Sequence, residues 1–289
     1  MAPQWQGYAE IIARLAAAFA LFTSALFGCR VPPSQARDLL AQGVSLMEDG
    51  QYSLADLCLE EVLSVDSTLD DAWYYRGLAF ADQDQPEDAD SCFARAISLN
   101  ATHRPSLFSR GQLRLRRSDI EGAISDFSEI AFIFPTLPDG YQGRAWVFER
   151  LGRFEEAVDQ WGLAIQVAPH DAFLYQERGY ALLRAARPDP AVVDFSRALL
   201  LDSSLSRSYA GRGEARYLLG LFTLAVSDCD SALVLDEEDA DAWLTRGRAA
   251  DYSGQFELAA DSYRRFLQLV PESDPDVPSV KMRLKRLAH

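Results

Sequence analysis

The segment DDAWYYRGLAFADQDQPEDADSCFARAISLNATH, residues 70–103, contains a spacing of small and bulky residues that recurs along most of the chain. Ala89 follows Gly77 by twelve residues and precedes Phe93 by four, and all three positions repeat at an interval of 34 residues. The alanine row comprises Ala55, Ala89, Ala123, Ala157, Ala191, Ala225 and Ala259. A fixed interval of this length indicates stacked copies of one supersecondary unit, none of which can bury its apolar face alone.

Two further rows keep the same register. Small residues stand at Gly43, Gly77, Gly111, Ala145, Gly179, Gly213 and Gly247, and bulky residues at Leu59, Phe93, Phe127, Trp161, Phe195, Cys229 and Tyr263. We expect two antiparallel helices per unit, with the glycine and alanine rows facing each other where the helix axes come close. Pro86 and Pro188 stand where the second helix begins, a position at which the missing N–H costs nothing.

This pattern resembles the tetratricopeptide repeat, which has an aromatic residue at position 4, Gly at 8, Ala at 20 and an aromatic residue at 24. The resemblance implies an all-α, right-handed solenoid of seven helix-turn-helix repeats. They fill 36–69, 70–103, 104–137, 138–171, 172–205, 206–239 and 240–273 without an insertion. We expect residues 274–289 to add a C-terminal capping helix, with Val280, Leu284 and Leu287 on one face. Its basic residues could form a charged outer face or contact anionic lipid.

The N-terminus reads as a targeting segment. Residues 15–27 are an uncharged apolar run of 13, too short to span a bilayer but suited to a secretory signal. The run ends in Leu26-Phe27-Gly28-Cys29, which resembles the bacterial lipobox, although Phe27 is larger than usual there. The resemblance implies a signal peptide over 1–28, a lipid on Cys29 and a tether over 29–35. An uncleaved anchor and a signal cleaved elsewhere remain alternatives.

Composition and charge narrow the functional classes. The 289 residues carry 28 basic and 43 acidic side chains, a net charge of −15, which disfavours binding of nucleic acid through a basic surface. The chain contains no glycine-rich nucleotide loop, GxSxG or HExxH motif, and its histidines lie near no set of possible metal ligands. We therefore expect no catalysis, no cofactor and no metal. Cys58, Cys92 and Cys229 are expected to be buried and unpaired.

The resemblance places a binding groove on the concave face formed by the first helices of the repeats. Its candidate residues are Tyr74, Leu78, Phe108, Arg116, Trp146, Arg150, Tyr180 and Arg184. Aromatic residues and arginine are enriched in interface hot spots, but the aromatics could instead fill space between neighbouring helices. Arg116, Arg150 and Arg184 share position 13, where they could form a row of cations for an acidic, partly apolar segment or only complement the helix dipole.

One row departs from the family. Position 7, usually Leu, is arginine in six consecutive repeats: Arg76, Arg110, Arg144, Arg178, Arg212 and Arg246. Carboxylates recur at position 22 or 23 of the repeat, in its second helix: Asp126, Asp159, Asp194, Asp228 and Asp261. We expect these groups to form a structural ladder of ion pairs between adjacent hairpins, which fixes register more than it adds stability.

These observations favour a membrane-tethered scaffold that binds a protein or peptide partner in its groove. The alternative is a structural subunit of a cell-envelope enzyme or secretion complex that uses its convex face or its ends. Arg30 after the cysteine, rather than Asp, favours the outer membrane, facing the periplasm or the exterior. The partner, the pathway and the oligomeric state cannot be read from the sequence.

The anchor is tested by replacing Cys29. If the cysteine carries lipid, the Cys29→Ser protein should stay unprocessed or become soluble, and globomycin should make the precursor of the wild type accumulate. Membrane fractionation and intact-mass measurement report both effects. Unchanged partitioning and unchanged mass would rule out the lipoprotein interpretation.

Overall fold

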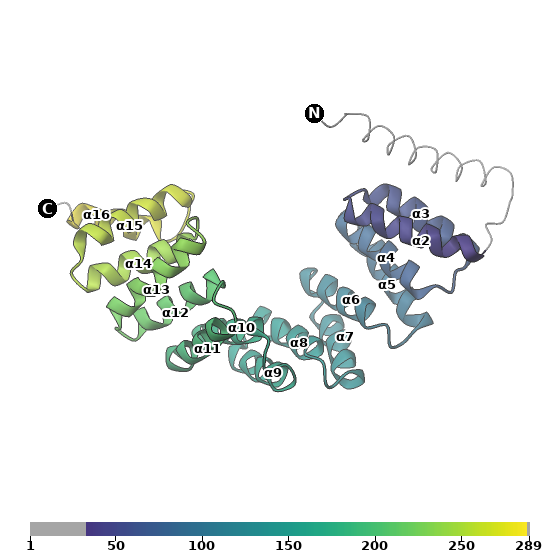
Figure 1. The fold of residues 1–289 in the computed structure, drawn as a ribbon, viewed down its shortest axis with the longest axis horizontal. Helices are drawn as coiled ribbons and strands as arrows, with labels where there is room; N and C mark the ends of the chain where they lie inside the picture. Colours follow the sequence, from purple (N-terminus) through teal and green to yellow (C-terminus); the bar gives the residue numbers. More distant parts are fainter. Residues whose placement is uncertain (1–32, 288–289) are drawn as a thin grey trace, which may run out of the picture. The chain divides into compact units, whose positions relative to one another are not determined.

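The structure, a computed structural model, describes residues 33–287, which form fifteen helices and no strand. The chain divides between Ser118 and Asp119 into two compact units. The helices of the first unit are α2 (Pro33–Glu48), α3 (Tyr52–Val65), α4 (Asp70–Asp82), α5 (Pro86–Leu99) and α6 (Arg104–Arg116). In this unit each helix packs against the next one in the chain (Figure 1).

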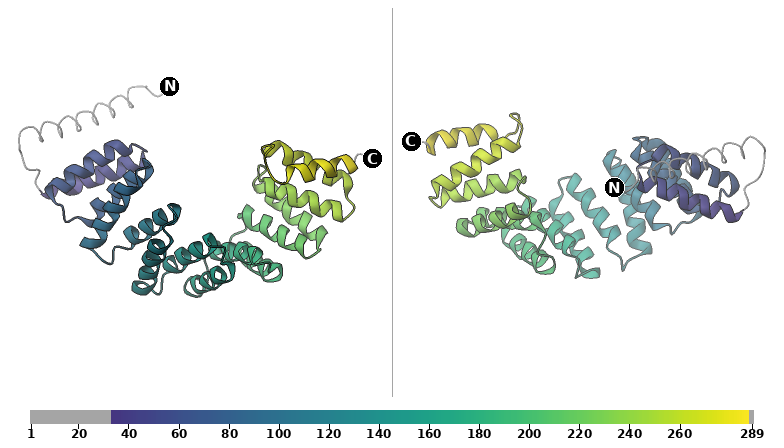
Figure 2. Two further views of the ribbon diagram at one scale, coloured as in Figure 1. Left: turned by 180° about the vertical axis from the view of Figure 1, so that it is seen from behind. Right: turned by 45° about the horizontal axis from the view of Figure 1, so that its top comes forward.

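The second unit contains ten helices of the described range. They are α7 (Ile120–Ile133), α8 (Asp139–Arg150), α9 (Phe154–Val167), α10 (Ala172–Arg184), α11 (Pro188–Leu201), α12 (Ser206–Leu218), α13 (Phe222–Leu235), α14 (Ala240–Tyr252), α15 (Phe256–Leu269) and α16 (Val277–Leu287). The pairs α8–α9, α10–α11, α12–α13 and α14–α15 are hairpins, and α12 also packs against both α10 and α14. Both views of Figure 2 place α16 beside α15 at the C-terminal end.

The ends of the chain differ in part from the expectation. The predicted signal 1–28 and the lipid site Cys29 lie outside the described residues. The expected tether over 29–35 is wrong for its last three residues, because α2 begins at Pro33. Proline is well tolerated in the first turn of a helix, where its missing N–H has no intrahelical partner. The predicted repeat 104–137 contributes α6 to the first unit and α7 to the second.

Close packing within the hairpins depends on an aromatic ring set against glycine. The seven alanines of the repeating row are fully buried, and the glycine row faces them in two repeats, where an added Cβ on Gly213 would lie 3.3 Å from the carbonyl oxygen of Ala225 and one on Gly43 would lie 3.8 Å from that of Ala55. Phe195 lies between Gly179 and Gly211, where an added Cβ would come within 2.8 Å and 2.5 Å of the ring. Gly77 meets Phe93 in the same way, at 2.6 Å. The absent Cβ therefore makes room for the ring of position 24.

The arginine row makes ion pairs, but with more varied partners than expected. Arg178 donates two hydrogen bonds to Asp194 and Arg212 donates two to Asp228, each on the second helix of its own hairpin. Asp194 and Asp228 are almost fully buried. Because Arg212 also donates to Ser196 on the preceding α11, its guanidinium joins two successive hairpins.

The pairing expected in the last repeat is wrong. Arg246 pairs with Asp230 on the preceding α13 and donates to the hydroxyl of Ser262, because Ser262 replaces the aspartate of that column. Asp261 is exposed and pairs with Arg264 on its own helix.

Elsewhere in the row, Arg76 pairs with Asp56 on α3, at 2.7 Å. Asp159 is exposed on α9, and Asp126 is buried on α7. Arg110 lies half-buried on α6, at the end of the first unit.

The fourth repeat interrupts this pairing. Gln160 occupies the column of Asp194 and Asp228, and its buried Oε1 accepts no hydrogen bond. The buried Nε of Arg144, in the arginine column of the same hairpin, donates none. Unsatisfied buried polar atoms reduce stability, so the α8–α9 hairpin has the weakest pairing of this kind among the described hairpins of the second unit.

The glycine–aromatic contact predicts opposite effects for two alanine substitutions. Gly211→Ala should destabilise the protein by about 1–3 kcal/mol, because the new Cβ overlaps the ring of Phe195, which is enclosed on both sides. Gly162→Ala, on α9, is the matched control, since its Cβ meets only Arg178 Nη1 at 3.7 Å. The control should gain about 0.5–1 kcal/mol from the lower backbone entropy of alanine. Urea unfolding measures both, and an equal gain from the two changes would contradict the packing account.

The ladder predicts that a carboxylate at position 23 of a repeat, the position of Asp194 and Gln160, stabilises its hairpin. Asp194→Ala strands Arg178 and should cost about 2–4 kcal/mol. Gln160→Asp gives Arg144 the acceptor that Arg178 has, and should add about 1 kcal/mol. Thermal unfolding of the three proteins separates the cases. If Asp194→Ala unfolds like the wild type, the ladder is not structural.

Candidate functional site

In the first unit the candidate groove residues are largely structural. Tyr74 and Leu78 on α4 are half-buried and pack against Phe93 of the core. The ring of Tyr74 also lies 5.4 Å from the imidazole of His103. These contacts favour the space-filling interpretation for Tyr74 and Leu78. On α6, Phe108 is half-buried and Arg116 is exposed.

His103 has a structural role that the sequence did not reveal. The residue is buried at the N-terminus of α6, where its Nδ1 accepts the backbone N–H of Ser106. The other ring nitrogen, Nε2, lies 3.1 Å from Asp71 Oδ1. His103 thus caps α6 and ties it to α4, and its position at a repeat junction was the only signal in the sequence.

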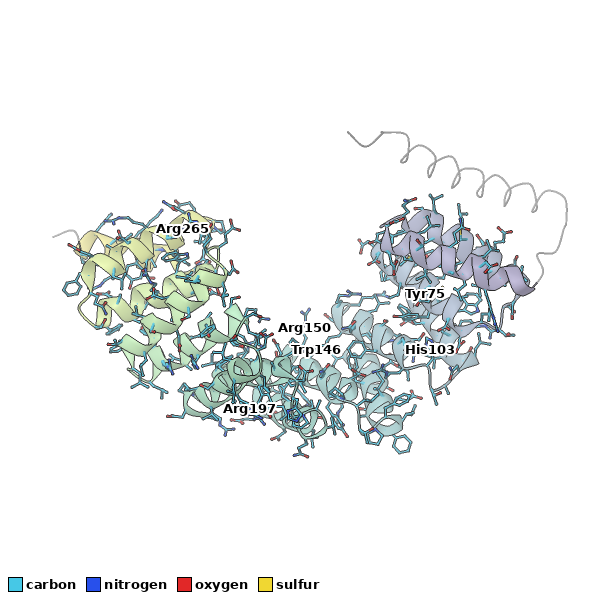
Figure 3. All side chains as sticks on the ribbon, in the orientation of Figure 1. Tyr75, His103, Trp146, Arg150, Arg197 and Arg265 are labelled. Atoms are coloured by element: carbon cyan, nitrogen blue, oxygen red, sulfur yellow. The ribbon has the colours of Figure 1, made fainter. Side chains whose placement is uncertain are left out.

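In the second unit, the first helices of the hairpins, α8, α10, α12 and α14, form what we call the A-helix face. Figure 3 labels Trp146 and Arg150, both on α8. Trp146 is half-buried and meets the buried ring of Trp161 edge to face, with centroids 6.1 Å apart. Arg150 is exposed and forms no ion pair with any residue of 33–287. The guanidinium of Arg150 is therefore available for an ion pair with a partner.

Tyr180 is fixed between three helices. Its hydroxyl donates to the carbonyl oxygen of Arg207 at 2.5 Å, and its ring meets Phe195 edge to face at 5.0 Å. The guanidinium of Arg207 lies over the same ring, 5.0 Å from its centroid. Tyr180 therefore offers a rigid wall rather than a mobile side chain.

Arg184, which was expected to share a row of cations with Arg116 and Arg150, forms an ion pair within the protein. Arg184 on α10 pairs with Glu149 on α8, and Glu149 also accepts the indole N–H of Trp161 at 2.8 Å. Burial raises the pKa of Glu149, whereas the indole and the guanidinium stabilise its ionised form. Because Glu149 occupies position 12 of its repeat, the repeat pattern alone did not indicate this pairing. Arg184 thus links neighbouring hairpins.

A hollow of about 620 Å³ opens on the A-helix face across α10, α12 and α14. We call it the acidic groove. Its lining includes Tyr180, Leu183, Arg184, Arg207, Gly211, Glu214, Asp236, Asp239, Asp241 and Thr245. Two of the predicted groove residues, Tyr180 and Arg184, are therefore brought together here. The carboxylates were not predicted, although the run DEEDAD over 236–241 was a visible signal.

The charges of the acidic groove are unbalanced. Arg184 is neutralised by Glu149, and Arg207 lies 3.4 Å from Glu177. Within residues 33–287, by contrast, no cation forms an ion pair with Glu214, Asp239 or Asp241. The far wall of the groove therefore carries uncompensated negative charge.

The surroundings of two of these carboxyls disfavour their ionised form. Shielding from water raises the pKa of Glu214, and Asp241 raises it further, whereas Arg248 and Arg184 oppose the shift. Shielding likewise raises the pKa of Asp239, which also caps α14 by accepting the N–H of Ala242. Both carboxyls would be stabilised in the ionised form by a cation placed in the groove.

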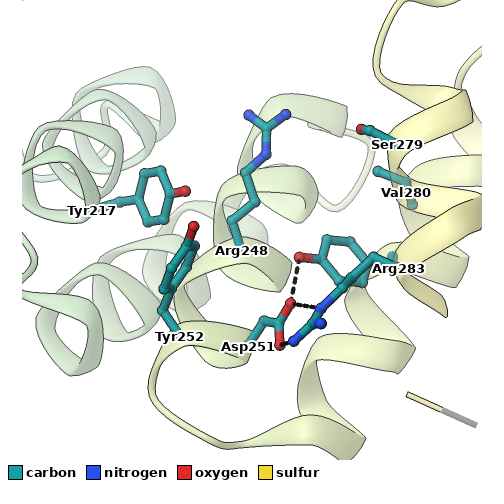
Figure 4. Close-up of a pocket in the computed structure, with 8 residues that line it drawn as sticks. Tyr217, Arg248, Asp251, Tyr252, Ser279, Val280 and Arg283 are labelled. Atoms are coloured by element: carbon teal, nitrogen blue, oxygen red, sulfur yellow. Dashed lines mark hydrogen bonds and ion pairs between the residues drawn. The ribbon is translucent and has the colours of Figure 1, made fainter. Parts of the chain in front are cut away.

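A second hollow, of about 410 Å³, lies between α12, α14 and the C-terminal α16 (Figure 4). Here Arg283 of α16 donates two hydrogen bonds to Asp251 of α14, which also accepts the hydroxyl of Tyr263. Arg248 reaches Asp276 at the start of α16. The charges of this second hollow are thus paired, and they hold the capping helix in place.

The cysteines of the described range are buried and free. Burial raises the pKa of Cys92 to about 11 and that of Cys229 to about 12, so neither thiol ionises readily. No set of three or more His, Cys, Asp or Glu side chains within 33–287 is arranged to hold a metal ion. None of the described helices is long and apolar enough to span a membrane.

Comparisons with known proteins agree with this architecture. Family models of the tetratricopeptide repeat match residues 40–89, 76–138 and 241–273. A search of curated proteins gave no match. Among solved structures, the Cut9–Hcn1 hetero-tetramer of the APC/C is similar over 86% of this chain, with 18% identity and a TM-score of 0.66. The present chain spans only 48% of that protein.

Two smaller structures match over nearly their whole length. A tetratricopeptide-repeat protein of Parabacteroides merdae is 15% identical, with a TM-score of 0.62 over 89% of this chain and 100% of its own. YrrB, described as having an unusual peptide-binding site, is 18% identical, with a TM-score of 0.55 over 67% of this chain and 97% of its own. The repeat models, the helical hairpins and these folds together identify the chain as a tetratricopeptide-repeat protein.

Proposed function

We propose that this protein is a non-catalytic adaptor that binds a segment of a partner protein in the acidic groove. The observation that carries the proposal is a hollow with rigid walls and uncompensated carboxylates on the A-helix face. The peptide-binding site named for YrrB, which shares the fold, supports the same use of this fold here.

The bound segment is basic and partly apolar. Glu214, Asp239 and Asp241 would pair with lysine or arginine side chains, while Tyr180 and Leu183 offer an apolar wall. This charge is opposite to the one expected from Arg116, Arg150 and Arg184, because Arg184 is already neutralised by Glu149. Arg150 remains available at the edge of the same face for a carboxylate of the partner.

We also propose that lipid on Cys29 tethers the adaptor to a membrane of the cell envelope, in keeping with the lipobox-like sequence. The tether would confine the acidic groove to the membrane surface, where a partner protein meets it at raised effective concentration. This part of the proposal rests on the sequence alone.

A structural subunit remains the second candidate. It is favoured by two apolar side chains exposed on the second helices of the hairpins, Leu200 at 74% on α11 and Val234 at 86% on α13. They occupy the same position of successive repeats, so they lie side by side on the outer face. Exposed apolar neighbours of this kind mark contacts with folded proteins. A structural subunit would need such a folded partner, whereas the adaptor captures short segments alone.

The proposed function predicts capture of a short basic peptide. A fluorescent peptide that alternates arginine with leucine should bind, and Glu214→Gln with Asp241→Asn should weaken its affinity at least tenfold, about 1.4 kcal/mol. The matched control is Asp159→Asn with Asp189→Asn, which removes two exposed carboxylates outside the groove. Fluorescence anisotropy at several salt concentrations measures all three proteins.

The outcomes are distinct. Equal weakening by the groove and control variants would mean that only net charge attracts the peptide, and would contradict the proposal. Binding should also weaken as the pH falls, since protonation removes the carboxylate charge. Because the pKa of Glu214 is raised above 4.5, this loss should begin at a higher pH than for an ordinary glutamate.

A further inference from the structure

The capping helix α16 presents a cationic surface on an otherwise acidic chain. We define its basic face as Lys281, Lys285 and Arg286, all exposed, with the exposed Met282 among them. Lys281 and Lys285 are the only lysines of the protein, whose net charge is −15. Of these three cations, Lys281 pairs with the exposed Glu272, whereas Lys285 and Arg286 have no ionic partner within the described residues.

The opposite side of α16 fixes the orientation of this face. Val277 and Val280 are buried against the core of the last repeat. Arg283 is bound to Asp251 (Figure 4). Asp276 is bound to Arg248, so that α16 is tied to α14 at two points. Helical periodicity then places Lys285 and Met282 on the side away from these contacts. The basic face is therefore held outward, away from α14.

The basic face and the acidic groove are complementary within one molecule but cannot meet there. The groove is built from α10, α12 and α14, and α16 is bound to α14 through its opposite side. The cations lie on the side of α16 that faces away from α14, so they cannot reach Glu214 or Asp241 of the same molecule. Only a second molecule can bring its basic face to the groove.

We propose that the basic face of α16 on one molecule docks in the acidic groove of a second copy, so that molecules associate head to tail. This inference rests on the proposed function and names the partner of that same groove. Lys281, Lys285 and Arg286 supply the cations that the unpaired carboxylates lack, and Met282 lies against the wall of Tyr180 and Leu183. A flexible thioether suits an irregular apolar wall.

Net charge does not forbid this contact. Two copies of charge −15 repel each other at long range, but at physiological salt charges separated by more than about 8 Å are largely screened. Pairs that touch within a partly desolvated groove are screened much less. The contact joins two different surfaces, so a pair of molecules keeps one free groove and one free cap, and association continues unless a ring closes.

The test uses two full-length variants, each with one surface reversed. The cap variant carries Lys281→Glu, Lys285→Glu and Arg286→Glu, and the groove variant carries Glu214→Lys and Asp241→Lys. Both are compared with the wild type in a non-ionic detergent by sedimentation velocity over a range of protein concentrations. Circular dichroism with thermal unfolding confirms that each variant is folded.

We expect the wild type to form dimers and longer assemblies as its concentration rises, and each variant alone to remain monomeric. An equimolar mixture should form dimers and nothing larger, because it contains one intact groove and one intact cap per pair. A wild type that stays monomeric at its highest soluble concentration would overturn the inference. So would variants that associate like the wild type, or a basic face that binds only vesicles of anionic lipid.

Failure of this inference is distinguishable from failure of the proposed function. The cap variant keeps the groove, so it should bind the basic peptide at least as tightly as the wild type, in which a second copy competes for the groove. If it does so while the wild type never self-associates, the groove serves another partner and the head-to-tail contact is rejected. If the peptide and the second copy both fail to bind, the acidic groove itself is not a binding site.

Discussion

The structure depends on one steric constraint, an aromatic ring enclosed between helix faces that lack a side chain. Phe195 has Gly179 on one side and Gly211 on the other, so α10, α11 and α12 can approach only at one separation and one register. Because interiors are packed as densely as organic crystals, this separation cannot adjust to a larger group. A related contact, between Gly143 of α8 and the ring of Phe127, joins α8 to α7.

That fixed spacing brings charged side chains of neighbouring repeats within reach of one another. Arg212 joins its own hairpin to the preceding one through Asp228 and Ser196. Glu149 and Arg184 do the same between α8 and α10 on the A-helix face. Burial makes such pairs costly to break, although it limits what they add to stability. The ion pairs therefore form between residues that the glycine contacts have already brought close together.

The functional surface is defined by the charges that remain outside these pairs. Arg184 would look like a ligand-binding cation if it were considered alone, but Glu149 neutralises it. Glu214 and Asp241 have no such partner within 33–287, and they lie beside a groove whose wall is the immobilised ring of Tyr180. A partner gains most where it compensates charge that the free protein leaves uncompensated.

The sequence by itself determined the helical hairpins, their number and the buried alanine row, because a 34-residue interval of small and bulky residues is a local property of each repeat. It also indicated the arginine column and two of its acceptors, Asp194 and Asp228. Only the tertiary structure decided that Arg246 turns to Asp230, that Arg184 is paired and that Gln160 leaves Arg144 Nε without an acceptor. The physical reason is reach: a long guanidinium side chain has several acceptors on two neighbouring helices, and which one it binds depends on distances that no periodicity specifies.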